Sequence, residues 1–229
     1  LQPMNDPNRM EKALEYLRDL RGHNDRAWFE AKRPRYEAAR AAFESLVAEL
    51  LSGFGPVDDL GGVSPRDCVF RINRDVRFSA DKSPYKTAFG ALLGPAGRKS
   101  GVRSYYLHVE PDGNSMLAGG LHSPSQAELG KVRDAIVRNS APLRAILAST
   151  DFVRRFGGLS GDSLKTAPRG YPKDHPDIGL LRRTQFLAVF SLADADLGAR
   201  NFVPLALETF SAMKPFLIWL EAACLAKAE

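Results

Sequence analysis

Residues Ser104 to Leu121 read SYYLHVE-PDGN-SMLAGGL and indicate two β-strands joined by a turn. Every second residue of Tyr105–Val109 is apolar, which is the period of a strand with one buried face. The Pro-Asp-Gly-Asn run at 111–114 is a turn signal. A turn this short joins antiparallel strands, because parallel strands need a long crossover connection.

The same reasoning predicts further strands on both sides of this hairpin. In Val69–Phe78 apolar and polar residues alternate, except that Arg74 falls on the apolar face. Short apolar runs at Ala88–Leu93 and Phe186–Leu192 also have the length of strands. With Ser104–Glu110 and Ser115–Leu121, these segments predict a mostly antiparallel sheet.

Helical patterns precede and follow the predicted strands. Apolar residues recur at three- and four-residue spacing, and Asn24 and a Ser123/Gln126 pair have the character of helix N-caps. The predicted helices are Arg9–Arg21, Asp25–Lys32, Pro34–Leu51, Ser123 to about Ala148, Asp151–Phe156 and Pro204–Lys227. Residues 157–176 form a long irregular segment rich in glycine and proline.

Helices, then strands, then helices define an α+β fold. We expect a single domain over residues 4–229, in which the mostly antiparallel sheet packs against N-terminal, central and C-terminal helices. Leu1-Gln2-Pro3, ahead of Met4, are left out of this prediction.

Cysteine usage and hydropathy restrict the class of protein. Cys68 and Cys224 lie far apart without a C-x-x-C partner, so the chain has neither a disulfide framework nor a zinc knuckle. The most apolar stretch, Phe216–Ala226, contains Glu221 and is shorter than the ~20 residues of a membrane span. We therefore expect a cytoplasmic protein that has no membrane partner.

Positive charge is concentrated in residues 66–103. This window holds nine Lys or Arg and three Asp, whereas the whole chain carries a net charge of +5. The rest of the chain is therefore close to neutral, and the local excess favours an anionic partner, either a small molecule or a polymer. The alternative is a solvated surface with spare charge.

The densest set of candidate ligand-binding residues lies between Arg71 and Lys86. Arginine offers a planar fork suited to phosphate or carboxylate groups. Arg74 is expected to be buried and paired, because an unpaired buried charge is costly. With Arg169 from the long irregular segment, the candidates are Arg71, Arg74, Arg77, Lys82, Tyr85, Lys86 and Arg169.

His108 and Glu110 share one face of a predicted strand and are candidates for acid–base catalysis. If His122 lay on the neighbouring strand, the three residues would have the composition of a facial metal triad. Such short motifs are more often surface ion pairs, so we assign no metal to them, and the sequence leaves any cofactor unknown. Phosphate-binding glycine loops are absent from the sequence, which excludes P-loop and Rossmann enzymes. Whether the protein is an enzyme stays open.

Several motifs together resemble the bacterial and fungal family known as domain of unknown function 2461. The resemblance covers about residues 10 to 220 and implies no established reaction. It does imply that the basic segment, Tyr106–Glu110 and the loop around Arg169 form one set of signature positions. The motifs that carry it are 24–29 (NDRAWF), 70–71 with 77–79, 81–87 (DKSPYKT), 105–111 (YYLHVEP), 119–121 (GGL), 168–171 (PRGY) and 175–176.

Three functions remain open on these grounds. The favoured hypothesis is a pocket protein that binds a small anionic ligand, because aspartates and apolar residues interrupt the basic residues. A nucleic-acid-binding module using residues 66–103 as a phosphate track is the alternative. An interaction scaffold without a ligand is the third. The sequence does not indicate an oligomeric state.

Overall fold

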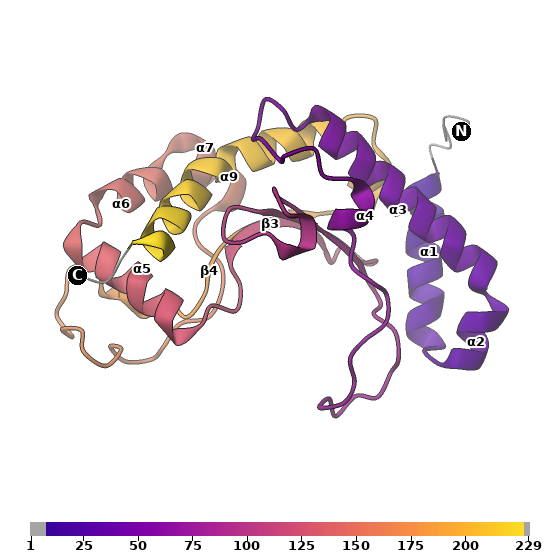
Figure 1. The fold of residues 1–229 in the computed structure, drawn as a ribbon, viewed down its shortest axis with the longest axis horizontal. Coiled ribbons are helices and arrows are strands. Elements are labelled where there is room, and N and C mark those ends of the chain that lie inside the picture. The colour runs from indigo at the N-terminus through magenta and orange to yellow at the C-terminus, as the bar shows by residue number, and fades with distance from the viewer. Residues whose placement is uncertain (1–7, 227–229) are drawn as a thin grey trace. The chain divides into compact units, whose positions relative to one another are not determined.

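A computed structural model describes residues 8–226 and contains the predicted α+β fold (Figure 1). Four antiparallel strands pair in the order β1-β2-β3-β4, so that neighbours in the sheet are also successive along the chain. Their bounds are β1 Phe89–Leu93, β2 Tyr105–Val109, β3 Ser115–Leu121 and β4 Phe186–Leu192. The expected alternation is clearest in β2, where Tyr105, Leu107 and Val109 are fully buried.

Helices precede the sheet, separate β3 from β4, and close the chain. The longer ones are α1 (Arg9–Gly22), α2 (Arg26–Ala31), α3 (Arg33–Gly53), α5 (Gln126–Arg138), α6 (Ala141–Ala148), α7 (Thr150–Phe156) and α9 (Phe202–Leu225). Single turns form α4 (Pro65–Cys68), α8 (Ile178–Leu181), η1 (Gly97–Lys99) and η2 (Asp194–Gly198). The predicted start of the domain at residue 4 and the predicted end of the last helix at Lys227 lie outside the described residues.

Two local predictions about the central helix were wrong. The central helix is not continuous to Ala148, because the chain breaks at 139–140 and Pro142 occupies the first turn of α6. Its N-cap is Ser125, not Ser123: the Ser125 hydroxyl accepts from the Glu128 amide, and the Glu128 carboxylate accepts from the Ser125 amide.

The chain divides into two compact units. The first contains the described residues up to Ser100, Tyr106–Leu117 and Ser191–Glu208, and the second contains Gly101–Tyr105, Ala118–Phe190 and the described residues from Thr209 onward. The single domain expected over residues 4–229 stays a prediction.

The first unit is built on α1 and α3, which pack along each other (Figure 1). Their apolar stripes bury residues such as Leu17 on α1 and Leu46 on α3. The ring of Phe43 on α3 stacks on that of Phe89 in β1, with centroids 5.4 Å apart. The helix pair is thereby joined to the first strand of the sheet.

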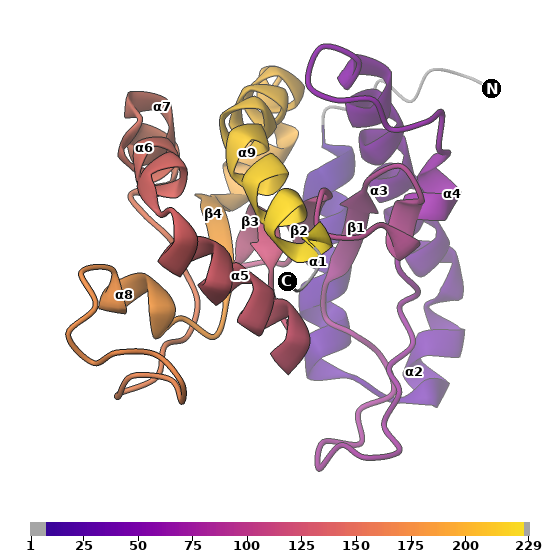
Figure 2. The same cartoon turned by 60° about the vertical axis from the view of Figure 1, so that its left-hand side comes forward.

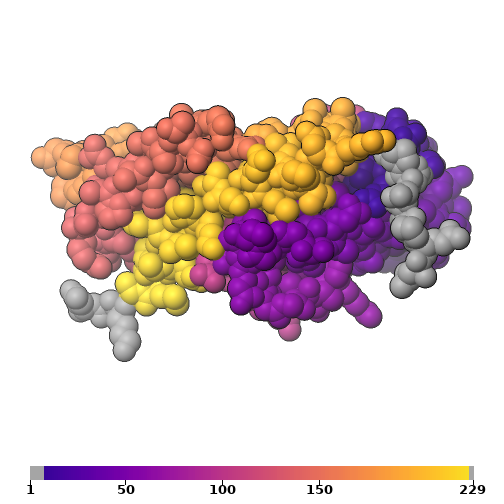
Figure 3. All heavy atoms as spheres, turned by 90° about the horizontal axis from the view of Figure 1, so that it is seen from above, coloured from indigo at the N-terminus to yellow at the C-terminus, as the bar shows by residue number. Residues whose placement is uncertain are grey.

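In the second unit, α7 packs against the C-terminal part of α9, and the segments that contain them border each other on the surface in Figure 3. Phe216 packs edge-on against Phe152, with ring centroids 5.8 Å apart. Figure 2 shows α8 within the irregular segment that precedes β4. Within residues 8–226, α9 is the helix that is long and apolar enough to cross a membrane. Its buried residues recur at three- and four-residue spacing, as in the core helix of a globular protein.

The expected strand at Val69–Phe78 was wrong. Only two isolated antiparallel bridges form there, Val69 to Ala91 and Asn73 to Tyr85. Beyond Asn73 the polar side chains bond to their own loop, which competes with a regular ladder. Phe78, expected on the buried face, is 96% exposed at the end of this loop.

Candidate anion-binding pocket

The segment Arg71–Lys86, called here the basic loop, is an irregular hairpin (Figure 1). Its two limbs are joined by the Arg74 amide donating to the Pro84 carbonyl at 2.9 Å and the Lys86 amide donating to the Ile72 carbonyl at 2.8 Å. These bonds flank the bridge between Asn73 and Tyr85, which makes that bridge a non-hydrogen-bonded pair. The amide and carbonyl of Tyr85 therefore face away from the first limb.

Asn24 pairs with both of these free backbone groups. Its side-chain amide donates to the Tyr85 carbonyl at 2.9 Å, and its side-chain oxygen accepts from the Tyr85 amide at 3.1 Å. The predicted N-cap role of Asn24 was wrong, since the Asp25 carboxylate caps α2 by accepting from the Trp28 amide. The ring of Tyr85 stacks on Phe29 of α2, with centroids 3.9 Å apart. These contacts fix the second limb of the basic loop against the end of α1 and against α2.

A concavity of about 450 Å³ opens beside this junction, within the first unit. We call it the His108 pocket. Its cationic side chains come from α1 and from both limbs of the basic loop, and its lining contains one carboxylate. The lining residues are Arg21, Asn24, Arg74, Asp81, Ser83, Tyr85, Lys86, Thr87, Ala88 and His108.

Arg74 is paired as predicted, but it is not buried. Its guanidinium forms an ion pair with Asp81 and donates to the Ser83 carbonyl at 3.2 Å. Its side chain is 26% exposed, because it lies at the rim of the pocket and not under the sheet. Bonds from the hydroxyl and amide of Ser83, followed by the contact with Arg74, lower the pKa of Asp81 to about 2.

This arrangement predicts the titration of Asp81. Because the folded pKa is depressed, the ion pair persists below the ordinary value of 3.8 and is lost as the pH falls through about 2. Replacing Ser83 with alanine removes the bond with the largest effect, so the midpoint should move back toward 3.8. Carboxyl chemical shifts measured by NMR against pH test this. An unchanged midpoint in Ser83→Ala would show that Ser83 does not set this pKa.

Lys86 is a partly buried cation of the pocket. Its ammonium group donates to the Arg71 carbonyl at 3.0 Å and lies 5.5 Å from the centre of the Phe70 ring. Burial, followed by repulsion from the Arg71 guanidinium, lowers the pKa of Lys86. An anion beside Lys86 would relieve both effects, because it would restore a favourable environment for the charged form.

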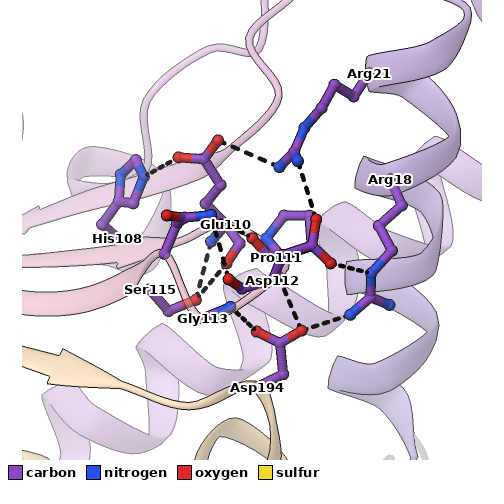
Figure 4. A network of polar contacts seen from close by, with 10 residues as sticks. Arg18, Arg21, His108, Glu110, Pro111, Asp112, Gly113, Ser115 and Asp194 are labelled. Atoms are coloured by element: carbon purple, nitrogen blue, oxygen red, sulfur yellow. Dashed lines mark hydrogen bonds and ion pairs between the residues drawn. The ribbon is translucent and has the colours of Figure 1, made fainter.

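His108 lines the pocket, and Figure 4 shows its contact with Glu110. Its Nε2 lies 3.0 Å from a Glu110 carboxylate oxygen, and its Nδ1 lies 3.0 Å from the Tyr106 hydroxyl. Arg21 donates to Glu110 at 3.4 Å and to Asp112 at 2.9 Å. Tyr106 and His108 of β2 and Glu110, the residue after it, thus form one polar row that ends at the Arg21 guanidinium from α1.

The turn between β2 and β3 is held from two directions (Figure 4). Asp112 has a left-handed backbone, with φ of 68°, so its amide and that of Gly113 point the same way. Both amides donate to the Asp194 carboxylate, at 3.0 and 2.9 Å. Arg18 of α1 bridges Asp112 and Asp194 and lowers the pKa of Asp112 by its hydrogen bond. This network positions α1, and hence Arg21 and Asn24, relative to β2.

The structure brings together only part of the predicted set. Arg74, Tyr85, Lys86 and His108 line the His108 pocket. Glu110 does not line the pocket, but its carboxylate contacts the His108 ring that does.

Three other predicted residues do not line the His108 pocket. Arg71 lines another concavity. Arg77 pairs with Asp75 at 2.7 Å, and Lys82 donates to the Val76 carbonyl at 3.0 Å. The expectation that Arg71 and Arg77 share one cavity with Lys86 was therefore wrong, because irregular backbone replaces the expected strand. Arg169 lies in the second unit, and its predicted role stays a prediction.

His122 also belongs to the second unit, where its ring bonds to the Ser123 hydroxyl at 2.9 Å. Within residues 8–226 no three His, Cys, Asp or Glu side chains are grouped so as to hold a metal ion. The residues that sequence reasoning missed are Arg21 and Asn24. Both lie at the end of α1, where local pattern indicates only a helix end.

Fold and pocket define the class: an α+β protein with a cationic surface pocket between a helix end and an irregular basic hairpin. Residues 12–219 match the family described as "Conserved hypothetical protein (DUF2461)", and the chain belongs to that family. No curated protein and no solved structure matches the chain.

Proposed function

We propose that this protein binds a small anionic ligand, with a phosphate or carboxylate group, in the His108 pocket. The observation that carries the proposal is the convergence of Arg21, Arg74 and Lys86 on one concavity from separate segments. Asp81 is the single carboxylate of the lining, and its bonds to Arg74 and Ser83 occupy it. Cations at fixed positions around a concavity are what binding of a compact anion requires.

The position of His108 favours binding over proton transfer. Both of its ring nitrogens are engaged inside the protein, one with Tyr106 and one with Glu110. A general acid or base must reach the proton it transfers, so one of these bonds would have to exchange first. We therefore propose His108 and Glu110 as residues that shape the pocket, and a catalytic role for them would need a second conformation.

The alternative of a nucleic-acid track has less support. A track needs cations spread over an exposed face, whereas Arg21, Arg74 and Lys86 line one concavity. We also propose a cytoplasmic location. Cys68 and Cys224 are free thiols, and burial raises the pKa of Cys68 to about 11, which makes this thiol unreactive.

The test removes the Lys86 charge while keeping the length of the side chain. Lys86→Met should weaken binding of inorganic phosphate or citrate by roughly 10- to 100-fold, since a hydrogen bond to a charged group contributes about 1.5–3 kcal/mol. Isothermal titration calorimetry measures the affinities. Lys99→Met is the matched control, because Lys99 is an exposed lysine of η1 that does not line the pocket.

Thermal unfolding without ligand separates lost binding from lost folding, because Lys86 also anchors the Arg71 carbonyl. Arg21→Gln provides a second variant from another segment and should also weaken binding. If neither phosphate nor citrate binds the wild type at millimolar concentration, the proposal fails. Equal affinities of the wild type and both pocket variants would place the anion elsewhere.

A further inference from the structure

A second basic concavity of about 480 Å³ lies in the first unit, and its lining is distinct from that of the His108 pocket. We call it the arginine pocket. Helices α3, α4 and η1 and the start of the basic loop surround it, and α4 packs against both α3 and η1. Its lining consists of Arg40, Arg66, Val69, Phe70, Arg71 and Arg98.

Two of its four guanidinium groups are fixed by the protein. Arg40 bonds to Glu44 at 2.8 Å and to the Tyr36 hydroxyl at 3.4 Å. Arg98 donates to the backbone carbonyls of Arg66, at 2.6 Å, and of Val69. Binding of Arg98 to carbonyl oxygens orients its guanidinium without cancelling its charge. These two arginines therefore form a prearranged wall, in which Glu44 offsets the charge of Arg40 and Arg98 keeps its own.

The other two guanidinium groups are open to a ligand. Arg66 and Arg71 are exposed, and neither side chain has a hydrogen-bond or ion-pair partner within residues 8–226. Two nearby carboxylates form their hydrogen bonds elsewhere, since Asp67 accepts from Ser64 and Asp75 pairs with Arg77. Beyond these bonds, the charges of Arg98 and Arg66 also lower the pKa of Asp67, and that of Arg71 lowers the pKa of Asp75, so these aspartates offset the arginine charges in part. The lining of the arginine pocket contains no carboxylate at all.

We infer that the arginine pocket binds a small molecule carrying at least two phosphate groups. Around this concavity the charges of Arg66, Arg71 and Arg98 repel one another, since within residues 8–226 only Arg40 of the four arginines has an ion-pair partner. An anion of high charge density relieves that repulsion. The forked geometry of guanidinium matches phosphate oxygens, and several such forks can engage neighbouring phosphate groups at once. The partly exposed ring of Phe70 adds an apolar surface that can contact a non-phosphate part of the ligand, whereas the Val69 side chain is buried.

The inference goes beyond the proposed function, because Arg66 and Arg98 do not line the His108 pocket. Arg66→Gln is the variant of choice, since its side chain is exposed and supports no hydrogen bond within the described residues. Arg33→Gln is the matched control. It removes the same charge from an exposed arginine of α3 that does not line the arginine pocket.

The experiment measures binding of inorganic pyrophosphate and of orthophosphate by isothermal titration calorimetry. Pyrophosphate should bind the wild type at least 10-fold more tightly than orthophosphate. Arg66→Gln should lose about 10-fold in pyrophosphate affinity, whereas Arg33→Gln should stay within a factor of about two. Arg21→Gln, which alters the His108 pocket alone, should also retain pyrophosphate binding, so the two sites succeed or fail separately.

Three results would overturn the inference. The first is no pyrophosphate binding, and the second is an equal loss in Arg66→Gln and Arg33→Gln, which would indicate general electrostatic attraction. The third is a single-stranded oligonucleotide or a vesicle of anionic phospholipid that binds more tightly than pyrophosphate and depends on Arg66. That result would replace the small ligand with a polymer or a lipid surface.

Discussion

Replacing Gly120 with alanine should lower the free energy of unfolding by roughly 3–5 kcal/mol, from backbone strain and overpacking together. Gly120 lies in β3 with φ of 120°, a region that side-chain-bearing residues rarely adopt. A Cβ atom there would lie 2.1 Å from the Phe186 carbonyl oxygen of the neighbouring strand. The Phe186 backbone cannot move aside as a flexible side chain can, so the hydrogen-bonded pairing of β3 with β4 would be disrupted.

Two other glycines give matched controls for this effect. A Cβ at Gly119 would meet the Met213 sulfur at 2.4 Å, and that side chain can rotate away, so Gly119→Ala should cost less. Gly130 in α5 has nothing within 4 Å, and Gly130→Ala should stabilise the protein by about 0.5–1 kcal/mol.

Chemical denaturation at fixed pH measures all three variants. In thermal melts the Gly120→Ala loss corresponds to a midpoint lower by roughly 6–20 °C. A Gly120→Ala protein as stable as the wild type would mean that the close approach of β3 and β4 is not as described.

The hairpin from β2 to β3 could be predicted because residues adjacent in the sequence determine both its strands and its turn. Alternating burial in β2 and the Asp112-Gly113 turn are properties of adjacent residues. The strands β3 and β4 match their predicted bounds, since period and length agree there. The expected strand from Val69 failed because alternation alone does not supply a pairing partner. Arg74 and Arg77 instead bond to aspartates of the same loop.

The pocket could be predicted only in part for the same reason. Tyr85 and Lys86 are close in sequence, and a basic run with a proline indicates a rigid loop. Arg21 joins them across more than sixty positions, through packing that no local pattern encodes. The separation of Arg71 from Lys86 into two concavities depends on which way each side chain leaves an irregular backbone. That direction follows from hydrogen bonds, which periodicity does not report.

Asn24→Ala should lower the free energy of unfolding by about 2–6 kcal/mol, because it leaves two backbone groups unpaired at about 1–3 kcal/mol each. The Tyr85 amide and carbonyl face away from the first limb of the basic loop, and the Asn24 side chain binds both. Tyr85 is buried against Phe29, so water replaces these bonds poorly. An asparagine amide is suited to this position, since it offers a donor and an acceptor side by side.

Asn24→Asp separates the two bonds, because a carboxylate keeps the acceptor for the Tyr85 amide and loses the donor to its carbonyl. Its loss of stability should lie between those of the wild type and Asn24→Ala. Asn73→Ala is the matched control. Asn73 lies opposite Tyr85 in the antiparallel bridge, and its side chain is exposed.

Amide hydrogen exchange at Tyr85 gives the site-specific readout. Protection of that amide should fall in Asn24→Ala and persist in Asn73→Ala. The same variant should weaken anion binding at the His108 pocket, because Lys86 follows Tyr85 directly and loses its fixed position. If Tyr85 stays protected in Asn24→Ala, the amide has another partner and Asn24 is not what holds the basic loop against α1.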